Sequence, residues 1–194
     1  MGERISLDPL LLLLLYFGDS KGRTEVRGRT KLEKLLFLVI KELEKRGYTI
    51  EDSDYIPYTY GPFSTRVFGL IDSLSNDGEI DIRKENDIEI FDLSKEKRKE
   101  LSEKIPRIKA RYSDIVEVIQ EIKRRFNELS TDFVTAYVYL KYPEFTNKSV
   151  IRDKIIETII EKIEKFREFV EKTGISERDL LSELKLIRKR RKGQ

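Results

Sequence analysis

Residues 30–43 read TKLEKLLFLVIKEL and residues 55–63 read YIPYTYGPF, and these two segments decide how the chain folds. The apolar residues of the first segment recur three, four and seven positions apart, which is the spacing of one helix face. Thr30 and Glu33 have the spacing of a capping box, in which each side chain bonds a free backbone N–H of the first turn. We therefore predict a helix that begins in this box and ends before Gly47.

A second helix and a hairpin are predicted after the aromatic turn. Pro62 suits the first turn of a helix, where its missing N–H would have no partner anyway. The expected apolar face consists of Val67, Phe68, Leu70, Ile71 and Leu74. Residues 79–82 and 88–91 alternate apolar and polar side chains around a polar connector, which predicts a β-hairpin. Two helices followed by a hairpin indicate a winged-helix-like domain.

The rest of the chain is predicted to be helical. Residues 10–17 are apolar throughout, but a membrane span needs about 20 such residues, so we expect a buried helix with Asp8 as its cap. Ser94 is the expected cap of a charged helix that Pro106 ends. A long helix over residues 150–170 has an apolar face suited to self-association, so we expect a possible homodimer.

These elements predict a mainly α fold of the α+β class with two domains. Residues 1–95 are expected to form a winged-helix-like domain with a β-hairpin wing. Residues 96–194 are expected to form a helical domain with a basic C-terminal tail. Glu3 and Asp8 interrupt what would be the basic start of a signal peptide, so we expect a cytoplasmic protein without a membrane partner.

The composition excludes most enzyme chemistry. The chain has no Cys and no His, so it has no disulfide, no thiolate zinc site and no imidazole base. It also lacks the glycine-rich cradle that binds nucleotide phosphates. We therefore predict a protein that is not an enzyme and that has no metal and no cofactor. Few thermolabile residues beside 39% charged residues are typical of a thermophilic, archaeal source.

Basic side chains gather in two segments, which we predict to bind nucleic acid, most readily DNA. Residues 21–34 carry six basic and two acidic side chains, and residues 185–192 carry six basic side chains and no acidic one. Such density favours contacts with phosphates, because the basic groups displace counterions. The candidates are Arg23, Arg27, Arg29, Lys31, Arg66, Arg188, Lys189, Arg190, Arg191 and Lys192. The alternative for the tail is a solubilising role.

A second set of residues is predicted to bind a protein partner. Residues 79–92 hold two basic and six acidic side chains, so the hairpin would repel phosphates and attract a basic partner. Its candidate contacts are Glu79, Asp81 and Asp87. Tyr58, Tyr60 and Phe63 add aromatic rings that can act as an interaction hot spot. The alternative is that these rings lock the turn against the core.

The sequence resembles a known family in the two segments quoted first. The helix Lys31-Leu32-Glu33-Lys34-Leu35-Leu36-Phe37 and the turn Tyr60-Gly61-Pro62-Phe63 are similar to the signature of the Panacea (SocA-like antitoxin) family. The segment Tyr142-Pro143-Glu144-Phe145-Thr146 is similar to a later Tyr-Pro segment of archaeal members. The resemblance implies a non-enzymatic, protein-binding or regulatory role, with toxin neutralisation as its known theme.

Two functions follow from these observations. The first is a non-enzymatic nucleic-acid-binding or regulatory protein associated with DNA, since the basic clusters are dense. The second is an antitoxin-like interaction module that binds and neutralises a partner protein. The basic tail and the presence of a wing favour the first, whereas the acidic charge of that wing and the family resemblance favour the second.

Overall fold

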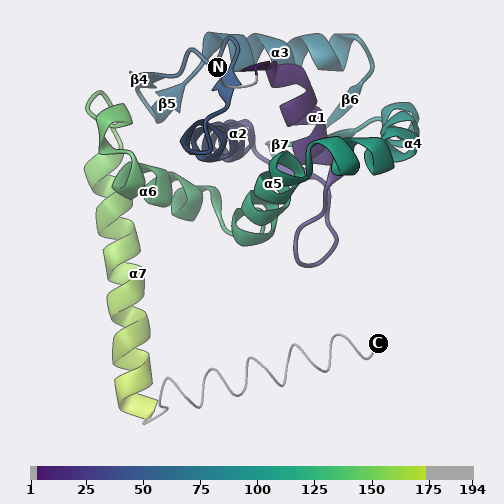
Figure 1. Ribbon diagram of the computed structural model, residues 1–194. Helices are drawn as coiled ribbons and strands as arrows, with labels where there is room; N and C mark the ends of the chain where they lie inside the picture. The colour runs from purple at the N-terminus through teal and green to yellow at the C-terminus, as the bar shows by residue number, and fades with distance from the viewer. Residues whose placement is uncertain (1–3, 174–194) are drawn as a thin grey trace. The chain divides into compact units, whose positions relative to one another are not determined.

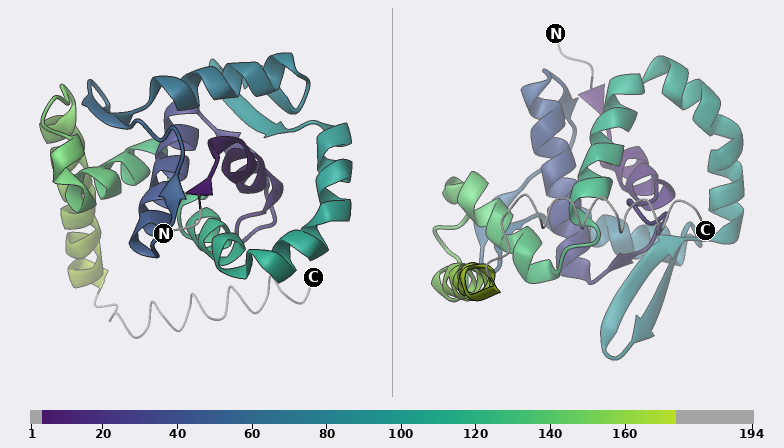
Figure 2. Two further views of the ribbon diagram at one scale, coloured as in Figure 1. Left: turned by 45° about the horizontal axis from the view of Figure 1, so that its top comes forward. Right: turned by 90° about the horizontal axis from the view of Figure 1, so that it is seen from below.

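Helix α2 (Arg29–Lys45) lies at the centre of the fold. Every residue from Lys31 to Ile40 is buried, including two lysines and a glutamate. Figures 1 and 2 place α1 (Leu7–Tyr16) beside α2, with α3 (Thr65–Asn76) on one side of the pair and α5 (Ser113–Phe126) on the other. The leucine run of α1 is buried, as predicted, and α1 packs against α2, α5 and β7.

The structure is a computed structural model that describes residues 4–173. The other helices are α4 (Lys95–Arg111), α6 (Thr131–Lys141), the 3-10 turn η1 (Pro143–Phe145) and α7 (Arg152–Thr173). The strands are β1 (Arg4–Ile5), β2 (Val26–Arg27), β3 (Thr49–Ile50), β4 (Ile56–Tyr58), β5 (Gly61–Phe63), β6 (Ile80–Glu85) and β7 (Ile88–Leu93). This part of the chain is mainly helical with small sheets, which confirms the predicted α+β class.

The largest sheet has three strands in the order β2-β7-β6. Strands β6 and β7 form the predicted hairpin, which projects from the helices in Figure 2 and pairs Ile80 with Leu93. Asn86 and Asp87 make its turn with positive φ angles of 47° and 63°, which suits the right-handed twist of the strands. Strand β2 pairs antiparallel with β7. Strand β2 consists of only two residues, which is too short to show an alternation of apolar and polar side chains, so the sequence does not predict it.

Two predicted helix caps are wrong. Helix α2 begins at Arg29, so its N-cap is Gly28, and the box at Thr30 does not form. Glu33 instead accepts a hydrogen bond from Ser64 N (3.3 Å), because its carboxylate is buried beside the start of α3. Helix α1 begins at Leu7, which leaves Asp8 inside its first turn, where a carboxylate still favours the helix dipole.

Two prolines do not act as predicted. Pro62 lies in β5 rather than in the first turn of α3, which begins after its N-cap Ser64. Pro106 lies inside α4 and does not end it. The side chain of Pro106 is exposed, so water can bond the Ser102 carbonyl that loses its helical donor.

The helices after the hairpin pack against the first part of the chain. Helix α5 contacts α1 and α2, and α6 contacts α2. The described residues up to Asp153 therefore form one compact unit, and the boundary expected near residue 95 lies inside it. A second unit begins at Lys154 and includes most of α7. No helix in the described residues is both long and apolar enough to span a membrane.

Candidate functional site

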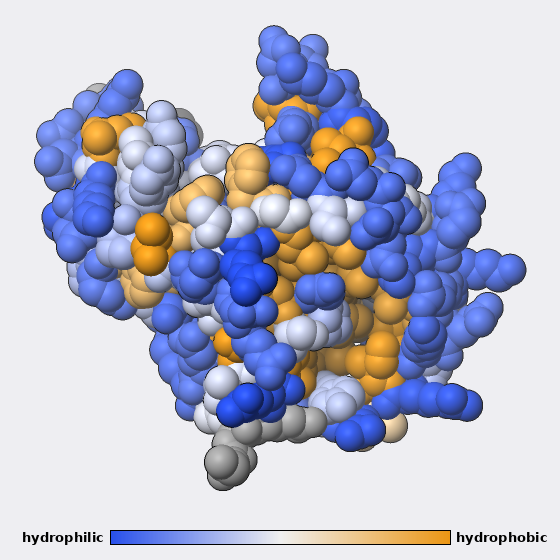
Figure 3. Space-filling view, turned by 90° about the horizontal axis from the view of Figure 1, so that it is seen from above, coloured by the Kyte–Doolittle hydropathy of each residue, from blue (hydrophilic) through white to orange (hydrophobic). Residues whose placement is uncertain are grey.

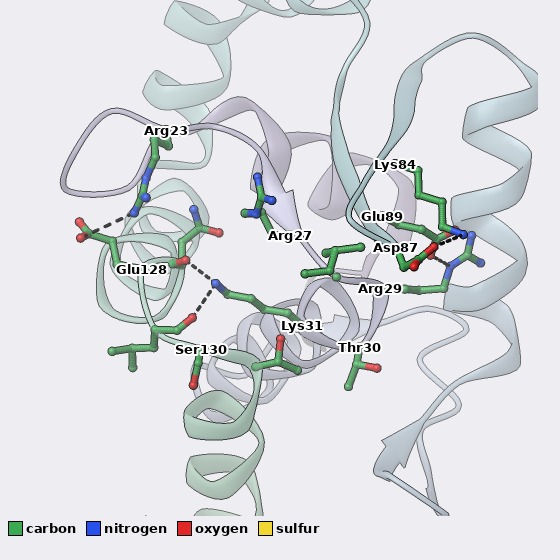
Figure 4. A pocket seen from close by; sticks show the side chains of 15 residues that line it. Arg23, Arg27, Arg29, Thr30, Lys31, Lys84, Asp87, Glu89, Glu128 and Ser130 are labelled. Atoms are coloured by element: carbon green, nitrogen blue, oxygen red, sulfur yellow. Dashed lines mark hydrogen bonds and ion pairs between the residues drawn. The ribbon is translucent and has the colours of Figure 1, made fainter. Parts of the chain in front are cut away.

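A cavity of about 790 Å³, here called the basic cleft, lies at the start of α2. The β6–β7 turn and the loop between α5 and α6 complete its walls. The charged side chains that line it are Arg23, Arg27, Arg29, Lys31, Lys84, Asp87, Glu89 and Glu128. Figure 4 shows Arg27 and Lys31 between Arg23 on one side and Arg29 on the other. Four predicted nucleic-acid-binding residues are thus brought together.

Helix α2 opens onto this cleft without a side-chain cap. Its N-cap Gly28 has a φ of 93° and supplies no side-chain acceptor. The first helical bond is the one that Leu32 N donates to Gly28 O (3.0 Å), so the N–H groups of Arg29, Thr30 and Lys31 precede it. Free N–H groups and the helix dipole make such an end attractive to anions.

Lys31 sits on the floor of the cleft and is 6% exposed. Its Nζ donates hydrogen bonds to the backbone carbonyls of Asn127 and Leu129, the latter at 2.7 Å. Burial lowers the pKa of Lys31, and the positive charge of Arg23 lowers it further. The ammonium group therefore links the start of α2 to the α5–α6 loop. The positive charge of Arg23 acts on it electrostatically.

The three arginines of the cleft already have carboxylate partners. Arg23 pairs with Asp19 (3.0 Å) and lies 3.6 Å from Glu128. Arg27 pairs with Glu85 at 3.1 Å, and both side chains are about half exposed. Of the three arginine pairs, that of Arg27 is the most open to solvent and hence the most easily exchanged for another anion.

Arg29 is held more firmly than the other two. It bonds Asp72 (2.9 Å) and Glu89 (3.2 Å), and its guanidinium lies 4.4 Å from the ring centre of Phe68. Arg66 lies apart from the cleft, on α3, and pairs with Asp52. The predicted contacts Arg188, Lys189, Arg190, Arg191 and Lys192 lie outside the described residues.

A second candidate site is the aromatic surface, formed by Tyr58, Tyr60, Phe63 and Phe68. It lies on the β4–β5 hairpin and the start of α3, around a small cavity of about 180 Å³. Tyr58, Tyr60 and Phe68 are 51%, 55% and 41% exposed, which is unusual for large rings on an otherwise charged surface. The ring of Phe63 lies 5.1 Å from that of Tyr58 and 6.0 Å from that of Phe68.

Buried polar groups of α2 hold this hairpin in place. Lys34 is 1% exposed, and its Nζ donates to the Pro62 carbonyl (2.5 Å) and lies 3.5 Å from a Glu33 oxygen. The Tyr55 hydroxyl donates to the Glu33 carbonyl (3.1 Å). Burial lowers the pKa of Lys34 and raises that of Glu33. Glu33 and Lys34 of α2 therefore fasten the aromatic turn to the core.

Close packing also fixes the turn at Gly61. A Cβ at Gly61 would lie 2.4 Å from a ring carbon of Tyr139, and its φ is 87°. The Tyr139 hydroxyl is 2.8 Å from Ser149 Oγ, which donates to the Thr59 carbonyl (3.3 Å). The Tyr-Gly-Pro sequence thus fits a tight approach between β5 and α6.

The acidic residues predicted to bind a partner are separated along the hairpin. Glu79 bonds Lys97 (2.8 Å) at the start of α4. Asp81 is exposed on β6, and Asp87 lies at the far turn, 3.3 Å from Lys84, on the wall of the basic cleft. Glu79 and Asp87 are eight residues apart along the hairpin, and the structure does not gather the three into one patch.

Several residues of these sites were not predicted from the sequence, among them Lys84, Glu89 and Glu128 of the basic cleft, and Phe68 and Asn127. Phe68 was expected in the core, but Val67, Ile71 and Leu74 already make the buried stripe of α3 and leave Phe68 exposed. Asn127 lines the basic cleft and is 7% exposed. Its Nδ2 donates to Asp19 (3.0 Å) and to the Glu25 carbonyl (3.2 Å). Its Oδ1 is the one buried side-chain polar atom of the described residues without a partner.

A third hollow is mainly apolar. Its volume is about 360 Å³, and it lies between α1, α4 and α5. Leu10, Leu13, Leu101 and Ile108 line it, with Lys104 at its rim. In the view from above, apolar side chains gather around a hollow and charged side chains surround them (Figure 3).

No family model matches the chain, and no curated protein matches it. The resemblance to the Panacea family therefore stays a prediction that rests on the two segments quoted above.

Proposed function

We propose that this protein is a non-enzymatic regulatory protein that binds a partner protein through its aromatic surface. The observation that carries the proposal is the exposure of three large rings, Tyr58, Tyr60 and Phe68, around one small cavity. Tyrosine and other aromatic residues dominate interaction hot spots, because a rigid ring buries much area at little entropy cost.

The contacts that hold the aromatic surface in place favour the same function. Lys34 and Gly61 fix the hairpin from below, so its rings are already arranged before a partner arrives. Such preorganisation reduces the ordering cost of binding. Arg29 extends the surface with a guanidinium that lies against Phe68 and also lines the basic cleft.

The proposed architecture is a winged-helix-like core with a Panacea-like role. Helices α2 and α3 precede the β6–β7 hairpin, and β2 adds a third strand, an order that supports a helix-turn-helix with a wing. The resemblance in residues 31–37 and 60–63 supports an antitoxin-like partner interaction. A regulatory protein of this kind acts by binding and needs no catalytic group.

The test begins with capture of the partner and ends with a measured affinity. The full chain and the variant Tyr60→Ala/Phe68→Ala are used side by side to capture proteins from a lysate of the source cells. The protein that only the full chain retains is then purified and titrated. We expect the double variant to raise the dissociation constant by about 100-fold, the loss typical of hot-spot rings. Leu140→Ala, an exposed apolar residue on α6, is the matched control and leaves it unchanged.

A second candidate function is nucleic-acid binding, with DNA as the main partner. It is favoured by the convergence of Arg23, Arg27, Arg29 and Lys31 in one cleft. The residues 188–192 supply further positive charge. Contacts of this kind bind phosphates irrespective of base sequence and weaken as salt rises.

Salt-dependent binding tests this second candidate. A random duplex and single strands are titrated between about 50 and 200 mM salt. We expect Arg27→Ala to reduce the salt slope by about one. Arg125→Ala is the matched control, because Arg125 is also half exposed and pairs with Glu121 at 3.0 Å outside the cleft. Equal salt dependences for the two variants would exclude the basic cleft as the nucleic-acid-binding surface.

A further inference from the structure

More basic than acidic side chains line the basic cleft, five against three. Burial lowers the pKa of Lys31 most, the positive charges of Arg23 and Arg27 lower it further, and the negative charge of Asp19 raises it. Arg23 and Arg27 are each paired with a carboxylate and still repel the Lys31 ammonium, in a cavity that also faces the uncapped start of α2. An anion at this point would relieve the repulsion and accept hydrogen bonds from the N–H groups of α2.

Asn127 adds a second and independent requirement. Its side chain is more than nine-tenths buried and lines the cleft, yet its Oδ1 accepts no hydrogen bond from any described residue. A buried acceptor without a donor costs free energy, so such atoms usually meet a ligand group or a water. Because the Nδ2 is already bonded to Asp19 and Glu25, the Oδ1 is the free end of the amide.

The two requirements describe one ligand. We infer that the basic cleft binds a phosphate monoester that carries hydroxyl groups, a sugar phosphate. The phosphate lies at the start of α2 beside Arg27, and a hydroxyl donates to Asn127 Oδ1. Glu128, on the same wall, is a further acceptor for hydroxyl groups. The volume of about 790 Å³ is in the range of small-ligand sites.

This inference does not depend on the partner-protein proposal. The inferred ligand would, however, occupy the same cleft as the nucleic acid of the second candidate function. A sugar phosphate occurs both as a free small molecule and at the 5′ end of a nucleic-acid strand. Both sources present the same phosphate and the same ring. The experiment therefore includes one arm for each.

The experiment is a calorimetric titration of the full chain at neutral pH and low salt. The four probes are ribose 5-phosphate, methyl phosphate, ribose, and a single-stranded RNA oligomer with a 5′ phosphate. We expect ribose 5-phosphate to bind, and methyl phosphate to bind about 10-fold more weakly because it offers no hydroxyl to the buried oxygen. Ribose without a phosphate should not bind.

Variants and spectra locate the binding. Arg27→Ala should weaken ribose 5-phosphate about 10-fold, since a charge-assisted contact is lost. Arg125→Ala should leave its affinity unchanged. In ¹⁵N spectra the amide signals of Arg29, Thr30 and Lys31 should shift on addition of the ligand, because their N–H groups begin the helix that faces the phosphate.

Several outcomes would overturn the inference. One is that ribose 5-phosphate fails to bind at about 1 mM, the weakest affinity of interest. Another is that methyl phosphate binds equally well, which would remove Asn127 from the site. Binding of the oligomer alone would reject the free sugar phosphate while leaving the nucleic-acid candidate intact. Binding of ribose 5-phosphate but not of the oligomer would support the inference and exclude the 5′ end of a nucleic-acid strand as the ligand.

Discussion

Buried lysines are the residues that most distinguish this chain at the scale of single side chains. Lys123 is fully buried on α5, and its Nζ donates to the Thr24 carbonyl (2.6 Å). Burial lowers its pKa to about 7, while Asp19 and Asp92 act in the opposite direction. In the unfolded chain the pKa is near 10.5, so between these values the unfolded state binds more protons than the folded state.

The free energy of unfolding should therefore rise with pH above about 7. The contribution of Lys123 has a slope of up to about 1.4 kcal/mol per pH unit, and below pH 7 the full cost of the buried lysine is present. Lys123→Met should flatten this rise. Urea unfolding at several pH values from 6 to about 9 measures both slopes. A variant that keeps the slope of the original chain would show that Lys123 does not titrate in this range.

Gly61 provides a second prediction at this scale, and Gly47 is its matched control. Both glycines have φ near 88°, but a Cβ at Gly47 meets no atom within 4 Å, whereas one at Gly61 would strike Tyr139. Gly47→Ala should cost about 1 kcal/mol for the left-handed conformation alone. Gly61→Ala should cost about 2 kcal/mol more, because the ring of Tyr139 must move. Denaturant unfolding of both variants compares the two costs, and equal costs would contradict the close packing.

At the scale of elements, helix α2 explains what could be predicted from the sequence and what could not. Its apolar spacing predicts the helix, and in the same way the predicted cap Ser94 is observed as the N-cap of α4. The partners of Lys31 and Lys34 could not be predicted, because they are carbonyls that lie 96 and 28 residues away. Local patterns report neighbours along the chain, and these bonds join distant parts of it.

The basic residues 21–34 show that the contacts of the candidate site, too, could be predicted only in part from the sequence. Its density in residues 21–34 is readable from the sequence, and so is the presence of carboxylates. The pairing of Arg29 with Asp72 and Glu89 depends on how α3 and β7 pack, so the sequence overstates how many cations are free for a ligand. Asn127 has no sequence signal at all, because an asparagine in a polar loop end is common.

Helix α4 allows a prediction about Pro106. Pro106 lies inside the helix and is exposed, so Pro106→Ala restores a helical hydrogen bond and removes no packing. We expect the free energy of unfolding to rise by about 1 to 2 kcal/mol, after the entropy that alanine adds to the unfolded chain is counted. Pro9→Ala is the control, because Pro9 is in the first turn of α1, where an added N–H gains no helical partner. Thermal unfolding of both variants measures the difference, and a gain for Pro9→Ala alone would contradict this account.

At the scale of the whole molecule, the two halves of the first unit are interlocked. Lys31 of α2 bonds the α5–α6 loop, and Lys123 of α5 bonds Thr24. Arg98 of α4 donates to the carbonyls of Leu15 and Tyr16, each at 3.3 Å. The faces of α1 and α2 that would be exposed in residues 1–95 alone are covered by α5 and α6. Composition and turn signals near residue 95 cannot reveal this cover, because it depends on tertiary contacts.

The last prediction follows from this interlocking. A chain of residues 1–95 should fail to unfold cooperatively, because it exposes the apolar faces of α1 and α2 and leaves buried Lys31 without its carbonyl acceptors. A chain of residues 1–153 contains the described compact unit and should unfold in a single cooperative transition. Circular dichroism and calorimetry of the two chains make the comparison. If residues 1–95 alone gave a cooperative transition, the boundary near residue 95 would separate true folding domains, and the contacts of α5 and α6 with α2 would be a docking interface between them.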